Sequence, residues 1–164
     1  MPTSKNHNII IGIDPGYDRL GIAVIEKQNP KDQLLFSDCI QTSSTLPFSE
    51  RLTIIGNSLK DLVAKYEPGL VAMEKVFVTN NQKTAMMVGE VRGALMYVLG
   101  CQNIPLVEYT PSEIKLTVTG NGSADKHQIM AMVKHLIIVN KPIKLDDEFD
   151  AIAIAITASA KEQF

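Results

Sequence analysis

The chain has 164 residues, a length that suits one compact domain and leaves little room for a second. Apolar residues make up 45% of it, which supports a hydrophobic core and argues against disorder. The 16 basic and 18 acidic residues leave a net charge of −2, so overall charge does not draw the protein to nucleic acid or membranes. No apolar run reaches the ~18 residues of a membrane span, and the first residues lack a signal-peptide core. We therefore expect a cytoplasmic protein.

Cysteines and histidines offer no catalytic or metal-binding pattern. Cys39 and Cys101 have neither the spacing of a metal site nor a disulfide framework, and we expect both to be small buried groups in a reducing compartment. His7, His127 and His135 have no Cys or Ser partner in a recognisable arrangement, so each is expected at the surface.

The chain opens with three expected strands. Residues 8–13 form an apolar run that ends at Asp14, where a Pro-Gly pair breaks the strand. Residues 20–26 and 34–41 have the composition of a second and a third strand. Because only short turns separate them, the three strands are predicted to form an antiparallel meander.

The rest of the chain alternates helices with short strands. Apolar spacing predicts helices over residues 51–66, 81–99, 111–116, 125–138 and about 147–161. Strands are predicted at 70–73, ending at Glu74, and at 104–109. The expected fold is therefore a mixed α/β domain with a five-stranded sheet flanked by helices.

Two acids stand directly at the ends of expected strands. Asp14 follows Ile-Gly-Ile, and Glu74 follows Val-Ala-Met. A carboxylate in such a position is costly to bury unless a positive group meets it, and the tips of α/β sheets are where ligands bind. Each acid alone fits a solvated strand end equally well, but two on separate strands favour a site.

A third acidic group opens the last expected helix. Asp147 and Asp150 are three positions apart and so share a face of that helix. Acids in a first turn are stabilised by the helix dipole, which alone explains them. The Ala-Ile repeat after Asp150, however, indicates a buried helix, whose acidic end then faces the sheet. Asp146 is an alternative to Asp147 as the functional acid.

Carboxylates that converge from two strands and a helix cannot all stay ionised unpaired. A hard divalent cation resolves the conflict, and all-oxygen ligands suit Mg²⁺, with Mn²⁺ as a substitute. Two such ions ~4 Å apart would serve in-line phosphodiester hydrolysis. The residues themselves thus point to a metal-dependent nuclease.

Four motifs carry a family resemblance: Ile-Gly-Ile-Asp14-Pro-Gly, Met-Glu74-Lys-Val-Phe77, Thr-Gly-Asn-Gly-Ser-Ala-Asp-Lys126 and Asp147-Glu-Phe-Asp150-Ala-Ile-Ala-Ile-Ala. In order and spacing they resemble the RuvC family of Holliday junction resolvases, from about Ile9 to Thr157. The resemblance implies a single RNase H-like nuclease domain over residues 1–164 that works as a homodimer. It also implies a Mg²⁺-dependent endodeoxyribonuclease that cuts two opposed strands of four-way DNA junctions in recombination and repair. A branch-migration helicase complex is a candidate partner.

The resemblance also assigns roles to residues. Asp14, Glu74, Asp147 and Asp150 fall on the four metal-binding acids, and Lys115 and Lys126 fall on catalytic, DNA-binding positions near the scissile phosphate.

Phe77 falls on an aromatic that stacks against unpaired junction bases, although the sequence alone fits a core Phe equally well. Lys75, Lys83 and Arg92 are predicted to extend the DNA-binding face. Gly89 and Gly93 lie four apart on the 81–99 helix, where the family forms its dimer; a tight contact with the chain's own sheet is the alternative.

Other functions remain open at this point. The opening Asp14, with Arg19 and Gly21, is also similar to YqgF-type nucleases of the RNase H fold that act on RNA. An actin-like nucleotide binder would require a second domain, which 164 residues cannot supply. A non-catalytic junction-binding protein is the last alternative, and the complete acidic set argues against it.

Overall fold

The computed structural model describes residues 6–77 and 81–163. Its strands are β1 (Asn6–Asp14), β2 (Arg19–Glu26), β3 (Asp32–Gln41), β4 (Pro68–Glu74), β5 (Leu106–Tyr109) and β6 (Ile137–Ile138). Its helices are α1 (Phe48–Tyr66), α2 (Gln82–Cys101), α3 (Pro111–Thr119), α4 (Lys126–Leu136) and α5 (Asp146–Lys161).

All of these strands form one mixed sheet in the order β5-β4-β1-β2-β3-β6. β1, β2 and β3 are antiparallel neighbours, which confirms the predicted meander. β4 pairs parallel with β1, and β5 pairs parallel with β4. The predicted α/β class is confirmed. Residues Ile9 to Ile13 of the central strand β1 are buried, and burial on both faces explains why four of these five residues are isoleucine.

The prediction of five strands was one short. The helix expected to continue to residue 138 ends at Leu136, and Ile137 adopts an extended backbone with φ −122° and ψ 148°. The two isoleucines then pair in parallel with the start of β3, where Asp32 lies opposite Ile137. β-branched residues favour this conformation, and a partner strand distant in sequence made it available.

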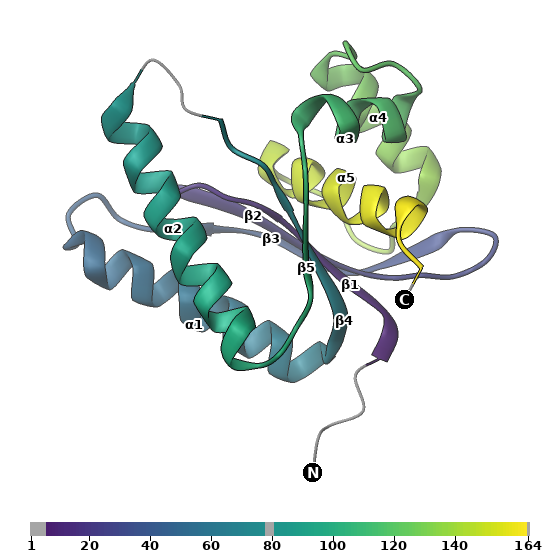
Figure 1. The fold of residues 1–164 in the computed structure, drawn as a ribbon. Helices are drawn as coiled ribbons and strands as arrows, with labels where there is room; N and C mark the ends of the chain where they lie inside the picture. The colour runs from purple at the N-terminus through teal and green to yellow at the C-terminus, as the bar shows by residue number, and fades with distance from the viewer. Residues whose placement is uncertain (1–5, 78–80, 164) are drawn as a thin grey trace.

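Helices cover both faces of the sheet (Figure 1), with α1 and α2 on one side and α3, α4 and α5 on the other. Two separate clusters of buried apolar residues lie beneath these two layers. Every residue from Ala151 to Ser159 in α5 is buried. The alternating Ala and Ile of this segment thus form a helix, as predicted, because a helix buried all round needs no polar face.

Two glycines let α5 lie directly on the sheet. A Cβ atom on Gly12 of β1 would lie 2.2 Å from the carbonyl oxygen of Ala151. A Cβ atom on Gly21 of β2 would lie 2.1 Å from the carbonyl oxygen of Asp147. Any larger residue at either position would push the start of α5 away from the ends of β1 and β2.

Several smaller expectations have clear outcomes. The prediction that both cysteines are buried was wrong for Cys101, which is exposed on α2, whereas Cys39 is buried in β3. His7, His127 and His135 are all exposed, as predicted. Within residues 6–77 and 81–163, no helix is long and apolar enough to cross a membrane.

Candidate active site

Three carboxylates meet at one end of the sheet. Asp14 ends β1 and Glu74 ends the neighbouring parallel strand β4, in a register that places Ile13 opposite Met73. The N-terminal end of α5, which carries Asp150, lies over the same end of these strands (Figure 1). All three acids line one pocket of about 140 Å³. The predicted convergence of Asp14, Glu74 and Asp150 is therefore present in the structure.

Asp14 lies at the centre of a concentration of negative charge. Burial, and after it the neighbouring charges of Glu74 and Asp150, raise the pKa of its carboxyl to about 7. Asp147 acts in the same direction, whereas the ammonium of Lys126 lowers the Asp14 pKa. Additional positive charge in the pocket would lower this pKa and favour the ionised carboxylate.

The other pocket acids share this environment. Burial is the main cause that raises the pKa of Glu74, with a contribution from Asp150 and opposition from Lys115. Burial also raises the pKa of Asp150, opposed by Lys126 and supported by Asp147. The fold thus holds three carboxyl groups together, although their ionised forms repel one another.

Both predicted catalytic lysines lie at this site. Lys115 of α3 lines the pocket beside the three acids. Lys126, the first residue of α4, places its Nζ atom 2.9 Å from an oxygen of Asp146. The structure therefore brings positive side chains to the rim of an acidic pocket, an arrangement suited to holding a phosphate between cations.

The first turn of α5 separates the roles of its two leading acids. Asp146 is exposed, and its carboxylate pairs with Lys126. Asp147 is half-buried beside the pocket, and its carboxylate accepts a hydrogen bond from the guanidinium of Arg19. Sequence reasoning did not assign Arg19 to the site. Its position at the start of β2, two residues before the tightly packed Gly21, is the signal that could have found it.

Another acid that sequence reasoning missed is Glu148. It is buried, and its carboxylate accepts a hydrogen bond from Ser37 Oγ at 2.5 Å and pairs with Lys141 Nζ at 3.1 Å. The backbone N–H of Lys144 also donates to it at 3.1 Å. Burial works to raise the pKa of Glu148, but these hydrogen bonds outweigh it and the pKa is lowered. Glu148 thereby fastens the start of α5 to β3.

The donor chemistry of the pocket fits a divalent cation. Asp14, Glu74 and Asp150 offer only carboxylate oxygens, the ligands of hard cations, and burial together with the charges of Glu74 and Asp150 raises the pKa of Asp14. No three His, Cys, Asp or Glu side chains in the described parts of the chain lie close enough to form a ready-made cluster. The acids line an open pocket instead, with Asp147 beside it.

The predicted DNA-binding residues fall into two groups. Lys75 and Lys83 are exposed, and 58% of Phe77 is exposed, which excludes the alternative of a core Phe. Phe77 shares a pocket of about 210 Å³ with Gly89 and Arg92 of α2. The guanidinium of Arg92, by contrast, donates to the Glu74 carbonyl oxygen at 2.6 Å.

Comparison with protein families places this site in a known context. The family model described as crossover junction endodeoxyribonuclease RuvC matches residues 10–158. The chain belongs to the RuvC family. RuvC proteins are divalent-metal-dependent nucleases.

Individual RuvC proteins match nearly the whole chain. RuvC of Rickettsia prowazekii is 38% identical over 156 residues, which cover 95% of this chain and 99% of the relative. RuvC of Rickettsia felis is 40% identical over 149 residues, or 91% of this chain and 96% of that protein. The structure of Thermus thermophilus RuvC in complex with a Holliday junction substrate superimposes with a TM-score of 0.87 at 29% identity, covering 93% of each chain. The RNase H-like fold of the RuvC family is thus confirmed.

Proposed function

We propose that this chain is a Holliday junction resolvase, a metal-dependent endodeoxyribonuclease that cuts two opposed strands of a four-way DNA junction. The observation that carries the proposal is the pocket in which Asp14, Glu74 and Asp150 meet Lys115, within a chain of the RuvC family. Carboxylates that could bind divalent metal and a lysine around one cavity suit metal-dependent phosphodiester hydrolysis. The four-way junction as substrate follows the relative whose structure contains one.

The chain's own residues supply binding and positioning. Asp14, Glu74 and Asp150, with Asp147 alongside, would bind Mg²⁺, two ions per site, and Mn²⁺ would substitute. When bound, the metal activates water and offsets negative charge on the phosphate. Lys115 and Lys126 stabilise the charge that develops on the phosphate oxygens during in-line attack.

Exposed groups beside the pocket would hold the junction. Phe77 lies three residues after Glu74 and presents most of its ring to solvent, so it can stack on an unpaired base at the crossover. Lys75, directly after Glu74, and Lys83, near the start of α2, are exposed and would contact phosphates.

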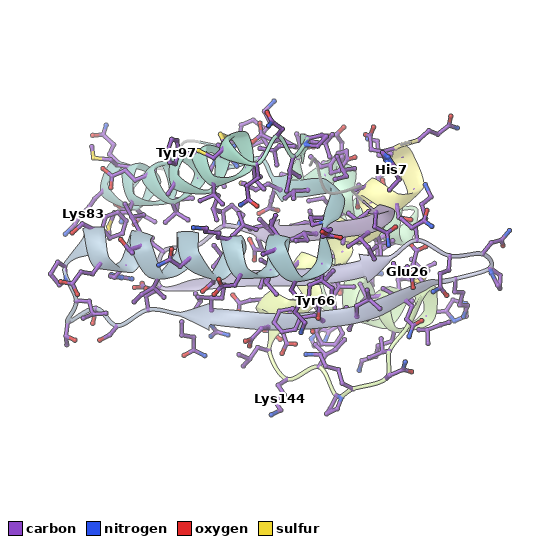
Figure 2. All side chains as sticks on the ribbon, turned by 90° about the horizontal axis from the view of Figure 1, so that it is seen from below. His7, Glu26, Tyr66, Lys83, Tyr97 and Lys144 are labelled. Atoms are coloured by element: carbon purple, nitrogen blue, oxygen red, sulfur yellow. The ribbon has the colours of Figure 1, made fainter. Side chains whose placement is uncertain are left out.

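The outer face of α2 is suited to dimer formation. Met86 is 67% exposed and Tyr97 is 74% exposed, and Figure 2 shows Tyr97 and Lys83 at the periphery of the molecule on this helix. A Cβ atom on Gly89 or Gly93 would meet no atom of the described residues within 4 Å, so neither glycine serves contact with the chain's own sheet. A two-fold dimer through this face would present two pockets to two opposed strands.

The remaining expectations complete the proposal. Residues 1–164 would act as a single nuclease domain in the cytoplasm, with a branch-migration helicase complex as a partner.

Cleavage of defined substrates tests the proposed function. A four-way DNA junction, a DNA duplex of equal length and a structured RNA are compared with and without Mg²⁺. We expect symmetric cuts in the junction that require the metal. Preferred cleavage of the RNA would favour a YqgF-like nuclease, and tight junction binding without any cutting would favour a non-catalytic protein.

A further inference from the structure

We propose that Arg92 is a positioning residue that fixes the backbone at Glu74, and that it does not bind DNA directly. The inference rests on the proposed function, because it assigns Glu74 to the metal site. It replaces the expectation, drawn from sequence, that Arg92 belongs to the DNA-binding face.

Arg92 joins three elements of the fold. From α2, its Nη1 atom donates to the carbonyl oxygen of Glu74 at the end of β4, at 2.6 Å. Its Nη2 atom forms an ion pair with the carboxylate of Glu108 in β5. At the same level of the sheet, the N–H of Lys75 donates to the carbonyl oxygen of Tyr109 at 2.7 Å. The guanidinium therefore links α2 and β5 to the backbone at the end of β4.

The covered position of the guanidinium argues against a phosphate contact. Only 14% of the Arg92 side chain is exposed, and its guanidinium already donates to two acceptors, the Glu74 carbonyl oxygen and the Glu108 carboxylate. If Arg92 turned toward DNA, the Glu108 carboxylate would lose its cation and the Glu74 carbonyl would lose its donor. Lys83, nearer the N-terminus of the same helix, is exposed and meets a phosphate without such a loss.

The contact also explains why α2 matters for the pocket. Glu74 is the last residue of β4, and the chain beyond it turns toward Phe77, which lines a pocket together with Arg92. Gly93, next to Arg92, belongs to the outer face that we propose for the dimer. A shift of α2 would therefore move Glu74, one of the acids proposed to bind metal, through the Arg92 side chain.

Two substitutions on this contact and two matched controls test the proposal. Arg92→Gln removes the guanidinium and Glu108→Gln removes its partner charge. As controls, Lys83→Gln removes a positive charge from an exposed position of α2, and Asp61→Asn removes a negative charge from an exposed position of α1. For each variant, Mn²⁺ affinity is measured by calorimetry without DNA, junction affinity is measured across salt concentrations, and kcat and KM are measured for cleavage.

We expect Arg92→Gln to weaken Mn²⁺ binding about tenfold or more, as loss of an outer-shell contact does, and to lower kcat about tenfold to a hundredfold. Its junction affinity and salt slope should stay close to wild type. Glu108→Gln should act in the same direction, although Glu108 cannot bind a phosphate. Lys83→Gln should show the reverse pattern, with weaker, less salt-dependent junction binding. Asp61→Asn should leave Mn²⁺ affinity, junction affinity, kcat and KM unchanged.

The proposal is overturned if Arg92→Gln follows the pattern of Lys83→Gln, or if it changes neither Mn²⁺ affinity nor kcat. If Arg92→Gln does not fold, Arg92→Lys takes its place, because it keeps the charge but cannot bridge both acceptors. That variant should lose kcat at an unchanged salt slope, and unchanged kcat would count against the proposal. A wild-type protein that binds Mn²⁺ but never cuts junctions would overturn the proposed function, while the Mn²⁺ comparison still decides the role of Arg92.

Discussion

The guanidinium of Arg19 pairs with the carboxylate of Asp147 at the first turn of α5. Both side chains come from segments that the close contact at Gly21 holds together. Asp147 is one of the acids proposed to bind metal. The guanidinium of Arg19 already gives its carboxylate a positive partner. If Asp147 binds metal as proposed, Arg19 would compete with the divalent cation for this carboxylate.

Replacing Arg19 by Gln should tighten metal binding in the absence of DNA. About half of the Arg19 side chain is exposed, so solvent screens the ion pair and the gain in Mn²⁺ affinity should be small. Calorimetric titration of Mn²⁺ into the DNA-free protein measures it, with Arg19→Lys as the charge-retaining control. Weaker binding in Arg19→Gln would mean that Arg19 holds Asp147 in its ligand position.

Removing a carboxylate from the pocket should separate cutting from binding. Asp14→Asn or Glu74→Gln should abolish cleavage of a four-way junction in Mg²⁺. Junction binding should stay intact or become tighter, since negative charge is lost close to phosphates. Gel-shift and cleavage assays on the same preparations check both effects, and near wild-type cutting by either variant would refute the assignment.

Phe77→Ala should lose activity without losing stability. A base stacked on an aromatic ring contributes ~1–3 kcal/mol, whereas truncation of a core Phe costs ~3–5 kcal/mol of stability. Because 58% of Phe77 is exposed, we expect the melting temperature of the variant to stay close to wild type while junction cleavage falls. A junction with mismatched bases at the crossover should partly restore cleavage. Without that rescue, Phe77 would not act by holding bases unpaired.

Gly93→Leu should give a folded monomer. A Cβ atom at this position would meet no atom of the described residues within 4 Å, and Gly93 is exposed, so we expect the protomer to tolerate a larger side chain. Replacing a helical Gly also favours the helix by up to ~1 kcal/mol. Analytical ultracentrifugation should find wild-type dimers and variant monomers, and the monomers should nick one strand at most. A wild-type monomer at micromolar concentration would refute the dimer through α2.

Acid should weaken the start of α3, the helix that carries Lys115. Glu113 accepts hydrogen bonds from Thr110 in a capping box and pairs with Lys161 at 3.1 Å. Bonds from the Thr110 backbone, then from Lys161, lower the pKa of Glu113 to about 2. Because the folded-state pKa is depressed, its stabilising effect is full at neutral pH and disappears as pH falls from about 4.5 to about 2.

Glu113→Gln tests this pH dependence directly. The variant should melt below wild type at pH 7, and the difference between the two melting temperatures should shrink as the pH approaches 2. A difference that stays constant across this range would show that the ionised carboxylate contributes nothing beyond the cap that Gln preserves.

The sequence alone determined most of the elements of this protein, all but β6, and the place of its main acids. Apolar runs ended by an acid located Asp14 and Glu74 at strand ends, and the parallel pairing of β1 with β4 then makes these ends adjacent. The Ala-Ile repeat after Asp150 indicated a buried helix, which directs its acidic end to the sheet. These properties follow from the spacing of apolar residues along the chain, which can be read without knowledge of the fold.

Only the tertiary structure decided which partner each polar side chain meets. Glu148 is bound to Ser37, 111 residues away, and Arg19 is paired with Asp147 across 128 residues. The fold also converted Arg92 from an apparent DNA contact into a link between Glu74 and Glu108, and separated Asp146 from Asp147. The strand β6 exists only because β3 lies beside it. Such outcomes depend on surfaces distant in sequence, and no local pattern encodes which of them a side chain will face.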